Sequence, residues 1–152
     1  MNVPKIQQEL LKALLVNPQN VNFFDFDDDK RIFIFDASVG YVLNADELRI
    51  DLSGAQVMTS LEDLFGRILI PENRLLETDE YRLGGTARKY LRQNNINDSV
   101  YVDQKHLKLF TTPMLYQAQD SDMMKIIVVA ELRDGKPSTV GCVFPVKVTE
   151  QI

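Results

Sequence analysis

Residues 125–148 read KIIVVAELRDGKPSTVGCVFPVKV, and this stretch decides the fold. Two runs rich in β-branched residues, 125–132 and 139–148, lie on either side of the turn-forming segment 134–138 (DGKPS). Glycine and proline between two such runs are typical of a β-hairpin turn. The stretch therefore predicts an antiparallel hairpin in the core. Its expected buried side chains are Ile127, Val129, Val140, Cys142 and Phe144.

Outward from this hairpin, short strands and short helices are expected along the chain. Residues 4–15 have the apolar spacing of a one-sided helix, with Pro4 in its first turn and Asn17-Pro18 at its end. The apolar face of this helix comprises Ile6, Leu10, Leu11, Leu14 and Leu15. Further expected elements are strands at 21–26, 30–36, 41–43, 48–52, 99–102 and 114–119, and helical turns at 60–65, 87–92 and 103–110.

These elements predict an α+β fold, with a single domain over residues 1–152 in which antiparallel β-hairpins pack against two or three short helices. The chain has 152 residues, of which 45% are hydrophobic and 26% charged, as in an ordinary globular domain. No apolar run approaches the ~20 residues of a membrane-spanning helix, and the first residues lack a signal-peptide pattern. We therefore expect a cytoplasmic protein that uses no membrane and no cofactor.

The hairpin predicted at 21–36 combines aromatic and acidic residues. Five phenylalanines lie within residues 23–35, which indicates either a strand buried on both faces or an interface with a partner protein. Between the two runs the aspartates resemble a calcium-binding loop, but Lys30 stands where that motif requires glycine, so no metal site is expected. The residues predicted to bind a protein partner are Phe24, Asp25, Asp27, Asp28 and Asp29.

A second candidate surface is basic, although the formal net charge of the chain is −5. Gly84-Gly85-Thr86 interrupts the chain before the helix expected at 87–92, whose free amides would attract an anion. On that helix three basic side chains would share one side. The residues predicted to contact nucleic acid, if any do, are Arg82, Arg88, Lys89 and Arg92.

No convincing catalytic set is present in the sequence. His106 is the only histidine, and Cys142 alternates with apolar residues in a predicted strand, so a Cys–His pair is not expected. A metal-dependent phosphoryl-transfer enzyme would have to use the acidic hairpin, and this is the weaker enzymatic alternative. Its metal-binding residues would be Asp25, Asp27, Asp29 and Asp36.

Three segments resemble pieces of bacterial DNA sliding-clamp domains: 78–83 (TDEYRL), 100–110 and 144–148 (FPVKV). The resemblance implies a DNA-associated protein, in which basic helices would line the DNA. The helices predicted at 4–15 and 103–110 offer only four lysines for that purpose, namely Lys5, Lys12, Lys105 and Lys108. A DNA-associated function therefore stands as an alternative.

The function expected from the sequence is that of a non-enzymatic protein-binding module. By analogy, small acidic proteins without a catalytic set often act by occupying a site on another macromolecule, as accessory or inhibitory proteins of phages and other mobile elements do. A protein partner is expected, and nucleic acid is the alternative partner through the local basic patch. The oligomeric state is left open.

Overall fold

The computed structural model describes residues 1–17, 21–27, 30–35, 39–44, 56–57, 69, 71–93, 95–117 and 126–147. The expected strand 48–52 and the expected helical turn 60–65 lie outside these residues. In chain order the elements are α1 (Val3–Val16), β1 (Val21–Asp27), β2 (Lys30–Phe35), β3 (Val39–Asn44), β4 (Gln56–Val57), the 3-10 helix η3 (Pro71–Asn73), β5 (Leu75–Arg82), β6 (Ala87–Arg92), β7 (Asn95–Asp103), the 3-10 helix η4 (Gln104–Leu107), β8 (Met114–Gln117), β9 (Ile127–Arg133) and β10 (Lys136–Val143).

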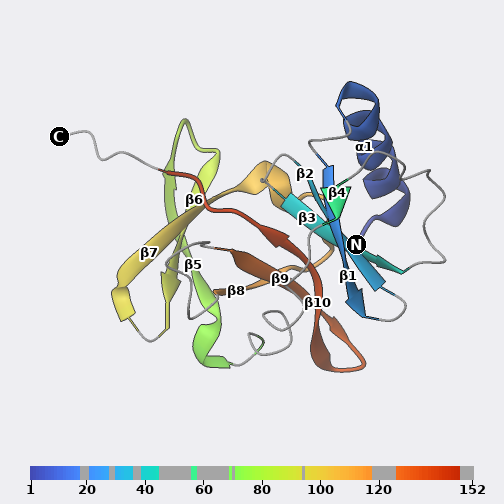
Figure 1. The fold of residues 1–152 in the computed structure, drawn as a ribbon. Helices are drawn as coiled ribbons and strands as arrows, with labels where there is room; N and C mark the ends of the chain where they lie inside the picture. Colours follow the sequence, from blue (N-terminus) through green and yellow to red (C-terminus); the bar gives the residue numbers. More distant parts are fainter. Residues whose placement is uncertain are drawn as a thin grey trace.

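The strands form two sheets, which lie side by side in Figure 1. The larger sheet has the order β4-β1-β2-β3-β10-β9-β8, and the smaller one has the order β5-β6-β7. Every pairing is antiparallel except that of β1 with β4. The expected mixture of antiparallel hairpins and helix is thus confirmed in its coarse form.

The expectation of two or three short helices is wrong within the described residues, where α1 is the one α-helix. Residues 87–92 form strand β6, because they pair on both sides with β5 and β7. These two ladders override the helix propensity of the arginine, lysine and leucine side chains. In the segment 103–110, Asp103 ends β7, and η4 and a turn follow it. The Asp103 side chain accepts a hydrogen bond from the backbone of Lys105 at 3.1 Å.

Helix α1 begins and ends as the sequence predicts. The Asn2 side chain accepts a hydrogen bond from the backbone N–H of Lys5 at 3.2 Å, which caps the first turn. Asn17, in an extended conformation, ends the helix. Only part of the expected apolar face is buried: Ile6 and Leu10 are fully buried, whereas Leu11 and Leu15 are exposed. The helix lies against the larger sheet at the end far from the smaller sheet (Figure 1).

The hairpin of β9 and β10 lies at the centre of the core, as predicted from residues 125–148. Ile127 and Val129 belong to one apolar cluster, which also contains residues of α1 and of the smaller sheet. Val128 and Ala130, which alternate with them along β9, belong to a second cluster with Cys142. Both faces of β9 are therefore buried, which explains its uninterrupted apolar sequence.

Four of the five predicted core residues of this hairpin are fully buried, namely Ile127, Val129, Val140 and Cys142. Phe144 is only partly buried and packs against the second cluster. The turn is shorter than segment 134–138, because Asp134 and Gly135 alone form it, with φ of 53° and 76°. Two positive φ angles in a two-residue turn suit the twist of an antiparallel hairpin.

One glycine of β10 is required by a close approach. A Cβ atom on Gly141 would collide with the carbonyl oxygen of Gly40 and would lie 2.8 Å from the ring of Phe110. The Phe110 ring also packs against Tyr41, with 5.1 Å between the ring centroids. Gly141 therefore makes room for an aromatic pair that holds the chain after η4 against β3 and β10.

Few backbone contacts connect the two sheets. Arg74 forms an isolated antiparallel bridge with Tyr116 of β8, and Tyr101 of β7 forms another with Val146. Apolar side chains of the smaller sheet, including Tyr90 and Val102, complete the first core cluster. The junction is therefore made mainly by side-chain packing.

Candidate functional site

The predicted basic stretch lies on the hairpin of β5 and β6, and not on a helix. Leu83, Gly84 and Gly85 all have positive φ in the turn between the two strands, at 54°, 70° and 87°. The Thr86 hydroxyl donates a hydrogen bond to the carbonyl of Leu83 at 2.8 Å and closes the turn. The helix N-terminus expected to bind an anion is therefore absent at this position.

Arg88 is engaged by its own hairpin. Its Nε donates a hydrogen bond to the carbonyl of Thr78 at 2.8 Å, and its Nη2 lies 3.4 Å from Glu77 and 3.8 Å from Asp79. The guanidinium also lies over the ring of Tyr81, 5.5 Å from the centroid. These contacts satisfy the charge of Arg88 without a nucleic-acid phosphate.

Lys89 is neutralised in the same way, because its Nζ lies 3.2 Å from Glu80 Oε2. The pairing of β5 with β6 explains the contact: Glu77 pairs with Tyr90 and Tyr81 with Arg88, so residues 78–80 bulge opposite Lys89. The Thr78 hydroxyl fixes this bulge by donating to the carbonyl of Lys89 at 2.9 Å. An acidic segment of β5 therefore covers the basic segment of β6.

Arg82 and Arg92 are the other two residues predicted to contact nucleic acid. Arg82 is exposed at the end of β5, where its Nη1 donates to the carbonyl of Tyr81 at 3.4 Å. In a strand, Arg88 and Arg92 share one face and Lys89 lies on the other. The expectation that all three share one side, which depended on a helix, is therefore wrong.

Large apolar side chains are exposed on the same hairpin. Leu76 and Tyr81 of β5 are each 42% exposed, and Leu83 in the turn is 56% exposed. Leu83 also adopts a left-handed conformation that costs a side chain such as leucine roughly 1–2 kcal/mol. Backbone strain in an exposed apolar residue is more typical of an interaction site than of a turn selected only for stability.

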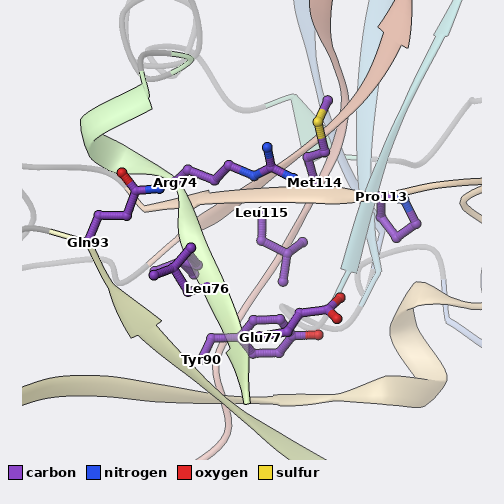
Figure 2. Close-up of a pocket in the computed structure, with 9 residues that line it drawn as sticks. Arg74, Leu76, Glu77, Tyr90, Gln93, Pro113, Met114 and Leu115 are labelled. Carbon is purple, nitrogen blue, oxygen red and sulfur yellow. The ribbon is translucent and has the colours of Figure 1, made fainter. Parts of the chain in front are cut away.

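A groove opens between β5 and β8, and we call it the β5–β8 groove. Its volume is about 370 Å³, within the range of small-ligand and peptide sites. Figure 2 shows Arg74 and Gln93 at one end, Glu77 and Tyr90 at the other, and Leu115 between them. The lining residues are Arg74, Leu75, Leu76, Glu77, Tyr90, Gln93, Pro113, Met114 and Leu115.

The floor of the groove is held in place by Tyr90. This side chain is almost fully buried, and its hydroxyl accepts a hydrogen bond from Gln104 Nε2 at 3.2 Å. Burial raises the pKa of the Tyr90 hydroxyl, and the hydrogen bond with Gln104 opposes this change in part. Tyr90 is therefore neutral at physiological pH and forms a rigid part of the groove floor.

The hairpin predicted to bind a protein partner is formed by β1 and β2. Phe24 pairs with Ile32, Asp25 with Arg31 and Asp27 with Lys30, with an irregularity between Asp25 and Asp27. Asp28 and Asp29 lie outside the described residues, and the structure describes Phe24, Asp25 and Asp27 by their backbone. β2 is an interior strand of the larger sheet, as its apolar sequence indicates. A partner interface at this hairpin stays a prediction.

Burial shifts the pKa values of both Cys142 and His106, the cysteine and the histidine singled out in the sequence. Cys142 is fully buried in β10, and burial raises the pKa of its thiol to about 12. A thiol with this pKa is protonated at neutral pH and unreactive. His106 lies on η4, where burial lowers the pKa of its imidazole and Asp103 partly opposes this change.

Within the described ranges, no three His, Cys, Asp or Glu side chains gather as a metal site would require, and Asp36 of the proposed metal set lies outside those ranges. No helix among the described residues is long and apolar enough to cross a membrane.

Comparison of the chain with protein-family models, with curated proteins and with solved structures gives no match. Its function must therefore be inferred from its own residues.

Sequence reasoning missed the β5–β8 groove, because its two sides come from segments far apart in the chain, 74–77 and 113–115. The ion pairs of the hairpin did leave a signal. An acidic run at 77–80 and a basic run at 88–92 lie on either side of Gly84-Gly85. Such opposite charges across a glycine turn are typical of a hairpin with cross-strand ion pairs.

Proposed function

We propose that this protein is a non-enzymatic protein-binding module that contacts its partner through the hairpin of β5 and β6. The observation that carries the proposal is the pairing of Arg88 and Lys89 with Glu77, Asp79 and Glu80. Because a phosphate-binding surface needs cations available to the ligand, this pairing disfavours nucleic acid as the partner.

The remaining exposed features of the hairpin suit a protein. Tyr81 and Leu83 offer exposed apolar surface near the turn, Leu76 offers more on the other face of β5, and aromatic residues are enriched in protein interfaces. The carboxylates of Asp79 and Glu80 lie beside them and remain accessible to solvent. With three carboxylates and four basic side chains over residues 75–92, the hairpin would offer a partner charged groups of both signs.

Site-specific photo-crosslinking tests this proposal with a matched pair of leucines. A photoreactive amino acid replaces Leu83 in one variant and Leu132 in the other, because both leucines are exposed beside a hairpin turn, at 56% and 61%. Irradiation of intact cells should join one defined protein to position 83 and none to position 132. The same products at both positions, or none at position 83, would contradict the proposal.

A nucleic-acid binding measurement tests the alternative function. Saturable binding of a DNA or RNA duplex at micromolar concentration, weakened by salt and abolished by Arg88→Glu, would favour the DNA-associated alternative. We expect no such binding at physiological salt. Thermal unfolding of Arg88→Glu must be measured in parallel, because the substitution also removes the contacts of Arg88 within the hairpin.

A further inference from the structure

The β5–β8 groove has the geometry of two strand edges that separate. Arg74 and Tyr116 form an antiparallel bridge, so continued pairing would place Leu75 opposite Leu115 and Leu76 opposite Met114. β5 instead forms a ladder with β6, and β8 with β9, but not with each other. The two edges therefore face the groove with backbone groups that no ladder uses, and such groups can pair with an added extended segment.

The two ends of the groove differ in charge. Arg74 lies at the end closed by its bridge with Tyr116, and none of the described residues forms an ion pair with its guanidinium. Glu77 lies toward the other end and pairs with Arg88, outside the groove lining. Leu76 and Met114 provide partly exposed apolar surface in the groove, and Leu115 lies buried beneath it (Figure 2).

We propose that the β5–β8 groove binds the C-terminal segment of a partner protein, with the terminal carboxylate on the Arg74 guanidinium. This inference rests on the proposed protein-binding function. The bridge between Arg74 and Tyr116 closes the groove, so an extended segment that enters between the strands must end there. A chain that ends at an arginine presents a carboxylate, which guanidinium binds with two parallel hydrogen bonds.

The remaining lining specifies the sequence of that segment. Its last residue is apolar, because Met114 and Leu76 border the space next to Arg74. Lysine or arginine occurs a few residues earlier, where the segment leaves the groove past Glu77 and reaches Asp79 and Glu80 along β5. The backbone of the segment would pair with β5 or β8 in the manner of an added strand.

A peptide array tests the inference directly. The probes are octapeptides with two lysines near the N-terminus and varied apolar residues at the C-terminus, printed once as free carboxylates and once as amides. We expect a subset to bind as free acids and to lose about tenfold in affinity as amides, since a hydrogen-bonded charge is removed. Equal binding of acids and amides, or no binding peptide at all, would overturn the inference.

Two variants locate the binding. Arg74→Met should weaken the free-acid peptides about tenfold and leave the amides unchanged. Arg133→Met is the matched control, because Arg133 is an exposed arginine at the end of β9 that does not line the groove. An unchanged affinity in Arg74→Met, or an equal loss in Arg133→Met, would show that the carboxylate is not bound at Arg74.

The outcome also separates this inference from the proposed function. If a partner is joined to position 83 and the bound free-acid peptides do not compete with it, the hairpin binds a protein but the groove does not receive its C-terminus. If no partner is joined to position 83, the protein-binding function itself fails. Thermal unfolding of Arg74→Met should match that of the unmodified chain, since the bridge to Tyr116 uses the backbone.

Discussion

The hairpins β9–β10 and β5–β6 have the same topology but opposite chemical character. β9 is buried on both faces and carries five consecutive buried residues, whereas β5 is exposed along most of its length. The turn of the first hairpin is Asp134-Gly135, two residues that tolerate a left-handed backbone, and the turn of the second begins with a strained Leu83. The comparison indicates that the first hairpin stabilises the fold and that the second is available for binding.

The largest expected effect is a loss of stability when β9 is truncated. Ile127→Ala should lower the free energy of unfolding by roughly 2–5 kcal/mol, because a fully buried side chain is replaced by a cavity. Leu132→Ala in the same strand is the control and should change stability by less than about 0.5 kcal/mol. Urea denaturation measures both, and equal losses would contradict the central position of Ile127.

Alkaline pH should destabilise the larger sheet next. Burial raises the pKa of Tyr41 and of Cys142 to about 12, so the unfolded chain loses these protons at lower pH than the folded one. Stability is therefore complete below pH ~9 and falls as the pH rises toward 12, by about 1.4 kcal/mol per pH unit and group. Unfolding midpoints from pH 8 to 11 test this, and a Cys142→Val variant should show a flatter decline.

Gly141→Ala in the β9–β10 hairpin and Gly84→Ala in the β5–β6 hairpin compare the cost of an added methyl group in the two hairpins. The methyl group added at position 141 would collide with the backbone of Gly40 and the ring of Phe110, so we expect a loss of roughly 1–3 kcal/mol. Gly84→Ala in the other hairpin meets no atom within 4 Å, although its positive φ still disfavours alanine. Urea denaturation measures both losses. A smaller loss at position 141 than at position 84 would show that the Phe110 ring can move away from position 141 in solution.

A smaller effect is expected from the contacts of Arg88. Arg88→Met should lower stability by about 1 kcal/mol, because it removes a hydrogen bond to Thr78 and ion pairs with two exposed carboxylates. The part due to the ion pairs should disappear at high salt. Thermal unfolding at low and high salt measures both parts, and a loss as large as that of Ile127→Ala would make this hairpin part of the stable core.

The smallest effect should be a gain. Leu83→Gly relieves a left-handed leucine, and after allowing for the added freedom of the unfolded chain we expect about 0.5 kcal/mol of stabilisation. Asp134→Gly is the matched substitution in the other turn and should bring no gain, because aspartate already tolerates this conformation. If Leu83→Gly is destabilising, the side chain contributes to folding and not to binding. The melting temperatures of the two variants decide this.

The same two hairpins show what the sequence could predict. The alternation and turn residues of 125–148 predict β9 and β10 correctly, because local pattern and burial agree there. The pattern at 87–92 favours a helix, and only its pairing with β5 and β7 makes it a strand. Pairing between distant segments also creates the β5–β8 groove, and for this reason its residues could not be found from local spacing.

The burial of Cys142 also has a practical consequence for spectroscopy. Because Cys142 is the only cysteine of the chain and is buried in the core, the folded protein should not react with maleimide dyes. A single cysteine introduced at Leu83 or Leu132 would therefore carry a label at a known place without removal of the native thiol. Fluorescence anisotropy of the two labelled proteins would then report directly which hairpin loses mobility when a partner binds.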